Sequence, residues 1–323
     1  MGQTIITAYY FLIAVIPLMI AAAIPILVTS PILKIASIAL ALPLYLISTI
    51  IVGGFLGRPW KKAIFPGVFP RKLSHNVYRA RRIYGAAWTS IFYNTPIYFL
   101  CVSVPFLRTL LFRLFGYQFE MKFTLAPDAW VRDLPCLKFE EGAYVGNKAT
   151  LGTNMCLSDG TILVDRVKVG KNSMIGHGTM AGPGANLKEN VEVSVSVVLG
   201  IRSIYKKGSK IGGHAGISHG VIIGENTEIG NFSYIGTKAI IGDNIKVMAG
   251  ASIPAGAEIL TQEECNRYHS SETQMLNSLR VQEMSKIREA SQNAETTNPH
   301  IGVKTEMASL HHLNVNEGIN KKN

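Results

Sequence analysis

Acidic residues are absent from the first third of the chain, and the first one is Glu120. Eleven Lys or Arg residues precede it, whereas residues 120–323 carry 21 basic and 21 acidic residues, so the formal net charge of +11 belongs to the N-terminal third. A nucleic-acid partner is not expected, because nucleic-acid-binding domains carry an excess of basic residues on the folded domain, whereas residues 120–323 are neutral. A basic excess beside long apolar runs instead predicts orientation in a membrane.

Cysteine is scarce as well, with four residues in the chain and no pair at CxxC spacing. Cys101, Cys136, Cys156 and Cys265 are far apart in sequence, so they suggest neither a disulfide framework nor a zinc knuckle. This usage is typical of a protein in a reducing compartment.

Residues 1–57 contain a single charged residue, Lys34. Two apolar stretches within them, Thr4–Val28 and Ile32–Leu56, each exceed the roughly 20 residues that cross a bilayer, which predicts a transmembrane hairpin. No basic segment precedes the first stretch and no cleavage site follows it, so we do not expect a signal peptide.

The loop Arg58–Arg82 carries eight Lys or Arg residues and no acidic residue. The positive-inside rule places this loop and the N-terminus in the cytoplasm, which predicts an integral protein of the bacterial inner membrane. A third membrane-associated segment, 86–107 within region 58–119, is broken by Pro96 and Pro105. We expect it to be re-entrant or interfacial, so that the following domain is cytoplasmic, whereas a full crossing would place that domain outside.

From Val145 to Ile259 an aliphatic or small apolar residue recurs at every sixth position, twenty times in succession. Ala181 and Tyr205 are weak members, and a glycine follows directly in eleven of the hexads. A helix repeats at 3.6 residues and a single strand at 2, so neither gives a strict period of six. Short strands joined by tight corners do, and residues 120–260 are therefore predicted to form an all-β parallel β-helix of about six coils.

Stacked inward residues fill a narrow prism and leave no internal pocket, so function is expected at outer faces, corners or subunit interfaces. Residues 261–292 carry a weak apolar stripe and are predicted to form a short helix that caps the last coil. Residues 293–323 have little apolar content and are predicted to form a disordered tail.

Three of the eight histidines lie in the repeats, each two or three residues after an inward position and therefore at a corner. His177 and His214 are separated by two coils and one residue, which predicts a common edge and a distance of roughly 10 Å. His219 falls at the next corner. His219 and His214 are candidate catalytic residues, a general base with its partner, and His177 is the third candidate. The alternative is that these histidines are solvated and inert.

Arg202, Lys206 and Lys207 lie close together in sequence near Tyr205. A basic corner cluster suits the phosphates of an acyl-CoA, so these three residues are the candidate cofactor-binding residues. A solvated charged face is the alternative.

The hexad pattern resembles that of the left-handed β-helix acyltransferases. The resemblance implies a left-handed coil, an exception to the right-handed crossover rule, and a homotrimer with a cofactor groove between adjacent subunits. It also implies transfer of an acetyl or related acyl group from acyl-CoA or acyl carrier protein to a hydroxyl or amine, with a histidine as base. Acyl-CoA is then a co-substrate, and no tightly bound cofactor is expected.

Two further resemblances concern shorter stretches. Ser74–Arg79, Leu110–Gly116 and Val167–Ala185 resemble the membrane-plus-β-helix terminal region of peptide-synthetase-like proteins of the poly-lysine synthetase type, although this chain has no adenylation or carrier domain. Ile211–Gly224 is similar to the paired-histidine stretch of γ-class carbonic anhydrases, which hold zinc with three histidines across a subunit interface. Residues 196–201, where the third histidine is expected, contain none, so no metal ligand is assigned.

The sequence thus predicts a membrane-anchored acyltransferase whose acceptor is a lipid-linked sugar, a glycan precursor or an amine-bearing lipid at the bilayer. A soluble acceptor gives no reason to hold the enzyme at the membrane. Two alternatives remain open, namely a non-catalytic scaffold or assembly module and a γ-carbonic-anhydrase-like metal protein. Likeness of fold does not decide among them.

Overall fold

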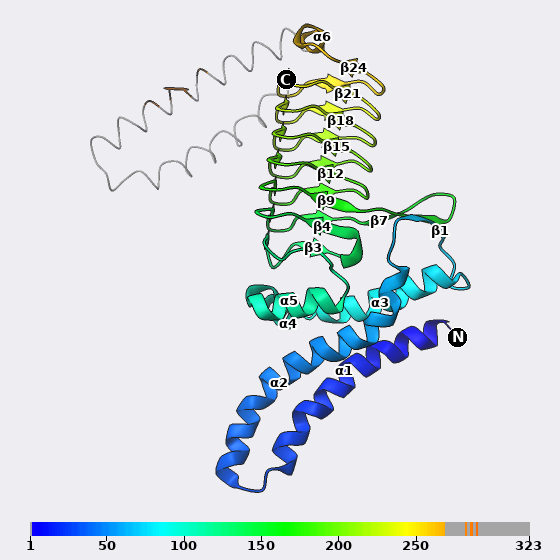
Figure 1. Cartoon of the computed structure of the whole chain (residues 1–323), viewed down its shortest axis with the longest axis vertical. Coiled ribbons are helices and arrows are strands. Elements are labelled where there is room, and N and C mark those ends of the chain that lie inside the picture. The colour runs from blue at the N-terminus through cyan, green and yellow to red at the C-terminus, as the bar shows by residue number, and fades with distance from the viewer. Residues whose placement is uncertain (1, 269–281, 283–284, 287–288, 290–323) are drawn as a thin grey trace, which may run out of the picture. The chain divides into compact units, whose positions relative to one another are not determined.

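The computed structural model describes residues 2–268, 282, 285–286 and 289. Within residues 2–268, two long helices lead into a group of shorter helices and then into a column of short strands (Figure 1). Most of the predicted capping segment 261–292 and all of the predicted tail 293–323 lie outside the described residues.

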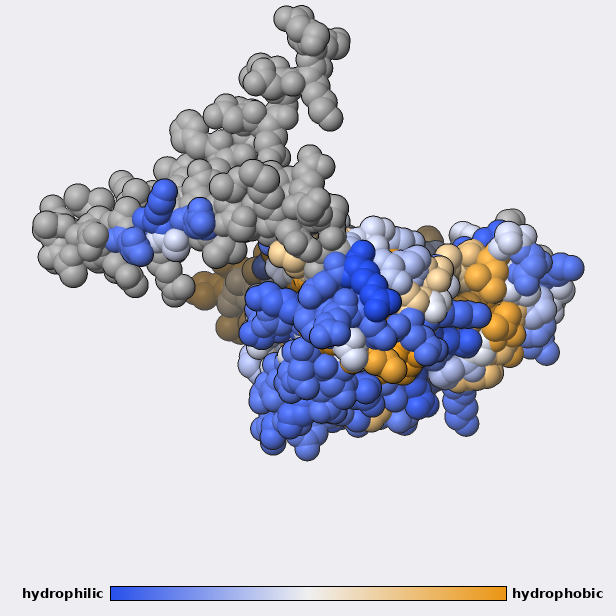
Figure 2. All heavy atoms as spheres, turned by 90° about the horizontal axis from the view of Figure 1, so that it is seen from above, coloured by the Kyte–Doolittle hydropathy of each residue, from blue (hydrophilic) through white to orange (hydrophobic). Residues whose placement is uncertain are grey.

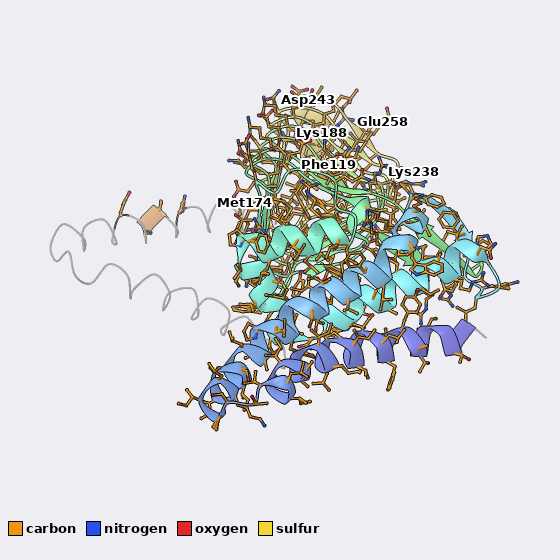
Figure 3. All side chains as sticks on the ribbon, turned by 60° about the horizontal axis from the view of Figure 1, so that its bottom comes forward. Phe119, Met174, Lys188, Lys238, Asp243 and Glu258 are labelled. Carbon is orange, nitrogen blue, oxygen red and sulfur yellow. The ribbon has the colours of Figure 1, made fainter. Side chains whose placement is uncertain are left out.

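The helical part begins with a hairpin of two apolar helices. Its elements are α1 (Gly2–Leu27), α2 (Pro31–Gly57), the 3-10 helix η1 (Arg58–Ala63), α3 (Asn76–Phe92), α4 (Thr95–Ser103) and α5 (Pro105–Leu114). Two helical stretches, Ile6–Leu27 and Pro31–Ala63, are long and apolar enough to cross a membrane. Side chains at the tip of the hairpin are apolar yet highly exposed, with Leu27 at 78% and Ile32 at 80%. Figure 3 shows such side chains projecting from both helices, as lipid contact requires.

The predicted third segment, 86–107, is divided among three helices. α3 ends at Phe92, and α4 and α5 each have a proline in the first turn, Pro96 and Pro105. A proline suits a first turn but clashes with a preceding helical turn, so each one starts a new helix. The axes of α4 and α5 are bent by 111°, which excludes one straight span.

The β-helix consists of three parallel sheets, which we call the first, second and third faces, and each has seven strands. The first face holds β2 (Thr124–Leu125), β5 (Tyr144–Val145), β10 (Met174–Ile175), β13 (Glu192–Val193), β16 (Lys210–Ile211), β19 (Glu228–Ile229) and β22 (Lys246–Val247). The second face holds β3 (Trp130–Val131), β6 (Thr150–Leu151), β11 (Met180–Ala181), β14 (Val198–Leu199), β17 (Gly216–Ile217), β20 (Tyr234–Ile235) and β23 (Ser252–Ile253). The third face holds β4 (Leu137–Phe139), β9 (Val167–Val169), β12 (Asn186–Leu187), β15 (Ile204–Tyr205), β18 (Ile222–Ile223), β21 (Ile240–Ile241) and β24 (Glu258–Ile259).

Seven coils therefore replace the predicted six, and the first coil begins at Thr124. The hexad pattern missed this coil because its spacing is irregular. Val131 and Phe139 both point inward and are 1% exposed, but the 3-10 helix η2 (Leu134–Cys136) lengthens the connection between them beyond six residues.

The second coil carries an insertion that the hexad pattern also concealed. β7 (Asn154–Cys156) and β8 (Thr161–Val164) form an antiparallel hairpin, and β1 (Gly67–Pro70), from the predicted basic loop, pairs with β8. Leu157 and Leu163, which the period places inside the prism, belong to this hairpin, so that prediction was wrong. Val169, the next inward position, lies 18 residues after Leu151 instead of six. The twelve extra residues equal two hexads, so the period of six stays in phase across the insertion.

The interior of the prism is filled as predicted. Ile175 and Val193 are paired in neighbouring coils and are fully buried. Small polar residues occupy the second inward position, and their hydroxyls are bonded to the main chain. Ser173 Oγ donates to Lys188 O at 2.6 Å and accepts from Val191 N at 2.9 Å, so it adds no unsatisfied polar atom.

We call the turns after the first, second and third faces the first, second and third corners. In the fifth coil they are residues 212–215, 218–221 and 224–227. Many corners hold a residue with positive φ, for example His214 at 57°. Gly200 shows how closely the coils stack, because a Cβ there would lie 2.1 Å from Ser218 O in the next coil. Only glycine fits at that position.

Aromatic residues join the helices to the first coil. Trp88 of α3 donates from Nε1 to Val131 O at 2.9 Å, and its ring centroid is 5.1 Å from that of Phe115. The ring centroid of Phe112, on α5, lies 6.0 Å from that of Phe123, beside the first coil. The open end of the β-helix is thus covered by the helical part (Figure 1).

At the other end, α6 (Gln262–Asn266) begins the predicted capping helix. Thr261 and Glu264 form a capping box, and the Gln262 side chain bonds both the N–H and the carbonyl of Lys246 in the last coil. Viewed from this end, the face presents mainly hydrophilic residues (Figure 2).

Candidate functional site

The three candidate histidines lie on two corners. His177 follows β10 and His214 follows β16, so both occupy the first corner, two coils apart. His219 follows β17 and occupies the second corner of the coil that holds His214. All three are exposed. The corner assignments agree with the hexad offsets, but β17 separates His214 from His219 and the structure shows no contact between them.

His219 is held against the main chain of the preceding coil. Its Nδ1 accepts a hydrogen bond from Ile201 N at 3.0 Å. A neutral imidazole that accepts at Nδ1 carries its own proton on Nε2. The ring therefore offers an N–H donor at Nε2 and takes up a further proton only at Nδ1.

Two basic residues flank His219 along the second corner. Arg202 lies one coil earlier and forms an ion pair with Asp165 at 2.9 Å. Lys238, labelled in Figure 3, lies one coil later. Its backbone N–H donates to His219 O at 2.8 Å. Asp165 balances the charge of Arg202, so Lys238 is the main source of positive charge beside His219, which favours anionic ligands and developing negative charge.

The first corner has a different character. The His214 ring stacks on Phe232, one coil later, with centroids 5.0 Å apart and planes 4° from parallel. Within residues 2–268, neither His214 nor His177 has a side-chain hydrogen bond or ion pair in the structure. Both have free nitrogen atoms, and stacking on Phe232, instead of a hydrogen bond, orients the His214 ring.

The predicted basic cluster is not a single cluster. Arg202 occupies the second corner, whereas Lys206 and Lys207 follow β15 and occupy the third. Closeness in sequence was misleading, because one strand is enough to move the chain from one corner to the next. All three residues also have acidic partners: Arg202–Asp165 at 2.9 Å, Lys206–Asp243 at 3.2 Å and Lys207–Glu189 at 3.4 Å.

A groove along the third face and third corner gathers more lysines than that prediction included. It has a volume of about 620 Å³ and is lined by Lys138, Lys168, Lys188, Lys206, Glu140 and Glu189, among others. The sequence signal is a lysine next to an inward residue of the third face in successive coils, for example Lys168 beside Val169 and Lys188 beside Leu187.

Acidic groups at the third corner are held in the charged form. The hydrogen bond from Lys138 Nζ, at 2.6 Å, lowers the pKa of Glu140. The backbone N–H of Glu225 lowers the pKa of Asp243, and Lys206 adds to that effect. Near neutral pH both carboxylates remain ionised, and Glu140 lines the groove, which therefore keeps mixed charges with lysines in excess.

The described residues contain no group of three or more His, Cys, Asp or Glu side chains that could hold a metal ion. The paired histidines that resemble the γ-class carbonic anhydrase stretch occupy different corners of one coil. Within the described part of this single chain, they do not converge on one point.

Comparison with known proteins identifies the repeats. Residues 206–237 match the family model described as bacterial transferase hexapeptide (six repeats). Among curated proteins, no match is found. The resemblance to peptide-synthetase-like proteins gains no support from these comparisons.

Several solved structures are similar to this chain. A mutant of GDP-perosamine N-acetyl transferase from Caulobacter crescentus, with CoA and GDP-perosamine, is 15% identical over 44% of this chain and 60% of that chain, with a TM-score of 0.28. The acetyltransferase domain of PglB from Neisseria gonorrhoeae, with acetyl coenzyme A, is 19% identical over 47% and 61%, with a TM-score of 0.26. UDP-N-acetylglucosamine O-acyltransferase from Moraxella catarrhalis is 14% identical over 56% and 94%, with a TM-score of 0.23.

The chain spans only about three fifths of the length of the first two proteins. These identities and TM-scores are too low to transfer an activity to it. The matched repeats and the stacked coils together establish a hexapeptide-repeat parallel β-helix that follows two candidate membrane spans.

Proposed function

We propose that this protein is a membrane-anchored acyltransferase that moves an acyl group from acyl-CoA or acyl carrier protein to a hydroxyl or amine of a membrane-proximal acceptor. The observation that carries the proposal is His219, an exposed imidazole held by a main-chain hydrogen bond on the edge of a filled prism. The matched repeats and the two candidate spans support the same function.

In the proposed reaction His219 is the general base. The acceptor hydroxyl or amine replaces the Ile201 N–H at Nδ1 and gives its proton to that atom. The acceptor oxygen or nitrogen attacks the thioester carbonyl and forms a tetrahedral oxyanion, which Arg202 and Lys238 are proposed to stabilise. Collapse of the intermediate breaks the carbon–sulfur bond, and the thiolate of CoA takes the proton back from His219.

The assay for this function is acyl incorporation into membrane extracts. Membranes that contain the protein are expected to transfer radioactive acetyl groups from acetyl-CoA into lipid or glycan fractions, whereas membranes without it do not. Equal incorporation in both samples would favour the scaffold, and stoichiometric zinc in the detergent-purified protein would favour the metal protein.

We propose the lysine groove of the third face as the site of the CoA phosphates. Replacing Lys168 and Lys188 together with alanine is expected to raise KM for acetyl-CoA by about tenfold, because each charge-assisted contact to a phosphate is lost. Lys210→Ala, on the first face, is the matched control and keeps KM within about twofold. A lower kcat with unchanged KM would contradict this placement.

The N-terminus, the basic loop and the β-helix are proposed to lie on the cytoplasmic side. Tyr9, near the start of α1, accepts a hydrogen bond from Trp60 Nε1 at 2.9 Å, so both outer ends of the hairpin lie beside the short helices. The homotrimer implied by the family resemblance stays a prediction.

Cysteine labelling tests this sidedness. Cys156, on the β7–β8 hairpin, is exposed, whereas Cys136 is buried and burial raises its pKa to about 12. A membrane-impermeant maleimide is expected to label Cys156 in inverted vesicles and not in intact spheroplasts. Cys156→Ser is expected to abolish the labelling, and labelling in intact spheroplasts would place the β-helix outside.

A further inference from the structure

A second cavity, apart from the second corner, lies where the helical part meets the first coil. Its volume is about 750 Å³, and α1, α3, the start of α4 and the first coil all contribute to it. We call it the junction cavity. The residues that matter for its chemistry are Ile6, Tyr10, Arg82, Thr89, Asn94 and Arg132.

The junction cavity is positively charged. Arg82 and Arg132 line it, and no acidic residue does. Arg132 Nε is buried, has no hydrogen-bond partner within the described residues and lies 3.9 Å from Asp133 Oδ1. Asp133 pairs with Arg132 through Oδ1 and, more closely, with Arg81 through Oδ2 at 2.6 Å, so one carboxylate is shared by two arginines and the group keeps a net positive charge.

Asn94 and the start of α4 add to the preference for an anion. Asn94 is the N-cap of this nine-residue helix, and its side chain makes no capping hydrogen bond. The positive end of the helix dipole lies there, next to the two arginines. Thr89 Oγ1, in contrast, already donates to Gly85 O at 2.7 Å, so the two arginines and the Asn94 amide are the groups available to an anion.

An apolar cavity adjoins the charged one. It has a volume of about 420 Å³, shares Tyr93 and Thr95 with the junction cavity, and is lined by Phe92, Tyr98 and Phe99. Ile6 and Tyr10 belong to the first helix, whose candidate span starts at Ile6. A positively charged pocket beside an apolar one, at the end of a membrane helix, matches a lipid with an anionic head group.

We propose that the junction cavity binds the phosphate of a membrane lipid head group and so presents the lipid-linked acceptor to the enzyme. This inference rests on the proposed function, since it names the acceptor class. The apolar cavity also reaches Asp128 and Asn147, at the first corner of the first two coils. Bound lipid therefore lies at the first corner of the β-helix, which also holds His177 one coil beyond Asn147.

Binding of short-chain lipids tests the inference without any acyl donor. The full chain in neutral detergent is titrated with dihexanoyl phosphatidic acid, dihexanoyl phosphatidylcholine and inorganic phosphate. Phosphatidic acid is expected to bind at least about tenfold more tightly than either of the others, because it alone combines an unpaired anionic charge with acyl chains. Equal binding of inorganic phosphate would make this a soluble-anion site, and equal binding of phosphatidylcholine would remove the role of charge; either result overturns the inference.

Variants locate the binding. Arg82→Gln combined with Arg132→Gln is expected to weaken phosphatidic acid binding by about tenfold or more, whereas Arg79→Gln, on the same helix but outside the cavity, changes it by less than about twofold. Gly85→Ala keeps every charge but places a Cβ 2.6 Å from Arg132 Nη2, so it is expected to displace the guanidinium and weaken binding too. Arg82 is exposed, so Arg82→Gln alone serves if the double variant does not fold.

The outcomes separate this inference from the proposed function. Unchanged binding in all the cavity variants overturns the lipid site, even if acyl transfer is intact. Selective lipid binding without any acyl transfer supports the cavity and counts against the acyltransferase alone.

Discussion

Replacing His219 with alanine is expected to lower acyl transfer by a factor of about 10²–10⁴, the usual contribution of a positioned general base. The side chain is exposed, so its removal creates no buried cavity and the coils are expected to keep their stacking. The rate of acetyl transfer from acetyl-CoA to the membrane extract is the measurement. Wild type and variant are compared at equal amounts of protein with equal thermal unfolding midpoints.

Further variants separate the roles open to this imidazole. His219→Gln keeps an N–H donor near the position of Nε2 but has no base. Activity close to wild type in His219→Gln would assign His219 to hydrogen-bond donation and contradict its role as base. If His214→Ala shows the large loss and His219→Ala does not, the chemistry lies at the first corner. Lys210→Ala on the first face is the control for an exposed change.

The β-helix was predictable because its period arises from covalent geometry. Each face takes up one short strand and one corner, so six residues advance the chain by one face and eighteen by one coil. The register of Ile175 with Val193 follows directly from that count. The number of coils was not predictable for two reasons. In the first coil η2 breaks the period of six, so this coil was not counted. In the second coil the β7–β8 insertion has the length of two hexads, so the period did not reveal it.

The same counting predicted part of the candidate site. It placed His177 and His214 on one corner and His219 on the next, because the offset from an inward residue fixes the corner. Arg202 and Lys206 were grouped by their closeness in sequence instead of by offset, and that grouping was wrong. Their acidic partners are 37 residues away, two coils and one residue, so counting by coils would have identified both ion pairs.

The junction cavity had no such signal. Arg82, Asn94 and Arg132 come from α3, α4 and the first coil, and no repeat relates their positions. Their convergence depends on how the helices pack on the end of the prism. That packing is set by aromatic side chains without regular spacing, chiefly Trp88 and its neighbours.

Trp88→Ala is expected to lower the free energy of unfolding by about 3–5 kcal/mol, the usual cost of removing a large buried ring. Trp88 is 1% exposed and contacts the rings of Phe92, Tyr98, Phe112 and Phe115 at centroid distances of 5.1–6.5 Å. Its loss leaves a cavity between the helices and the first coil, and Val131 O loses its donor. Thermal or chemical unfolding of the full chain in detergent measures the change.

Two companion variants show which contact matters at this junction. Trp88→Phe keeps most of the ring but removes the N–H, so a smaller loss of about 1–3 kcal/mol is expected from the unpaired carbonyl. Phe106→Ala removes a ring that is 73% exposed on α5 and is expected to change the unfolding free energy by less than about 0.5 kcal/mol. If Trp88→Ala behaves like Phe106→Ala, the aromatic cluster does not hold the helices to the β-helix. In that case the junction cavity would lack the rigid wall that a lipid site requires.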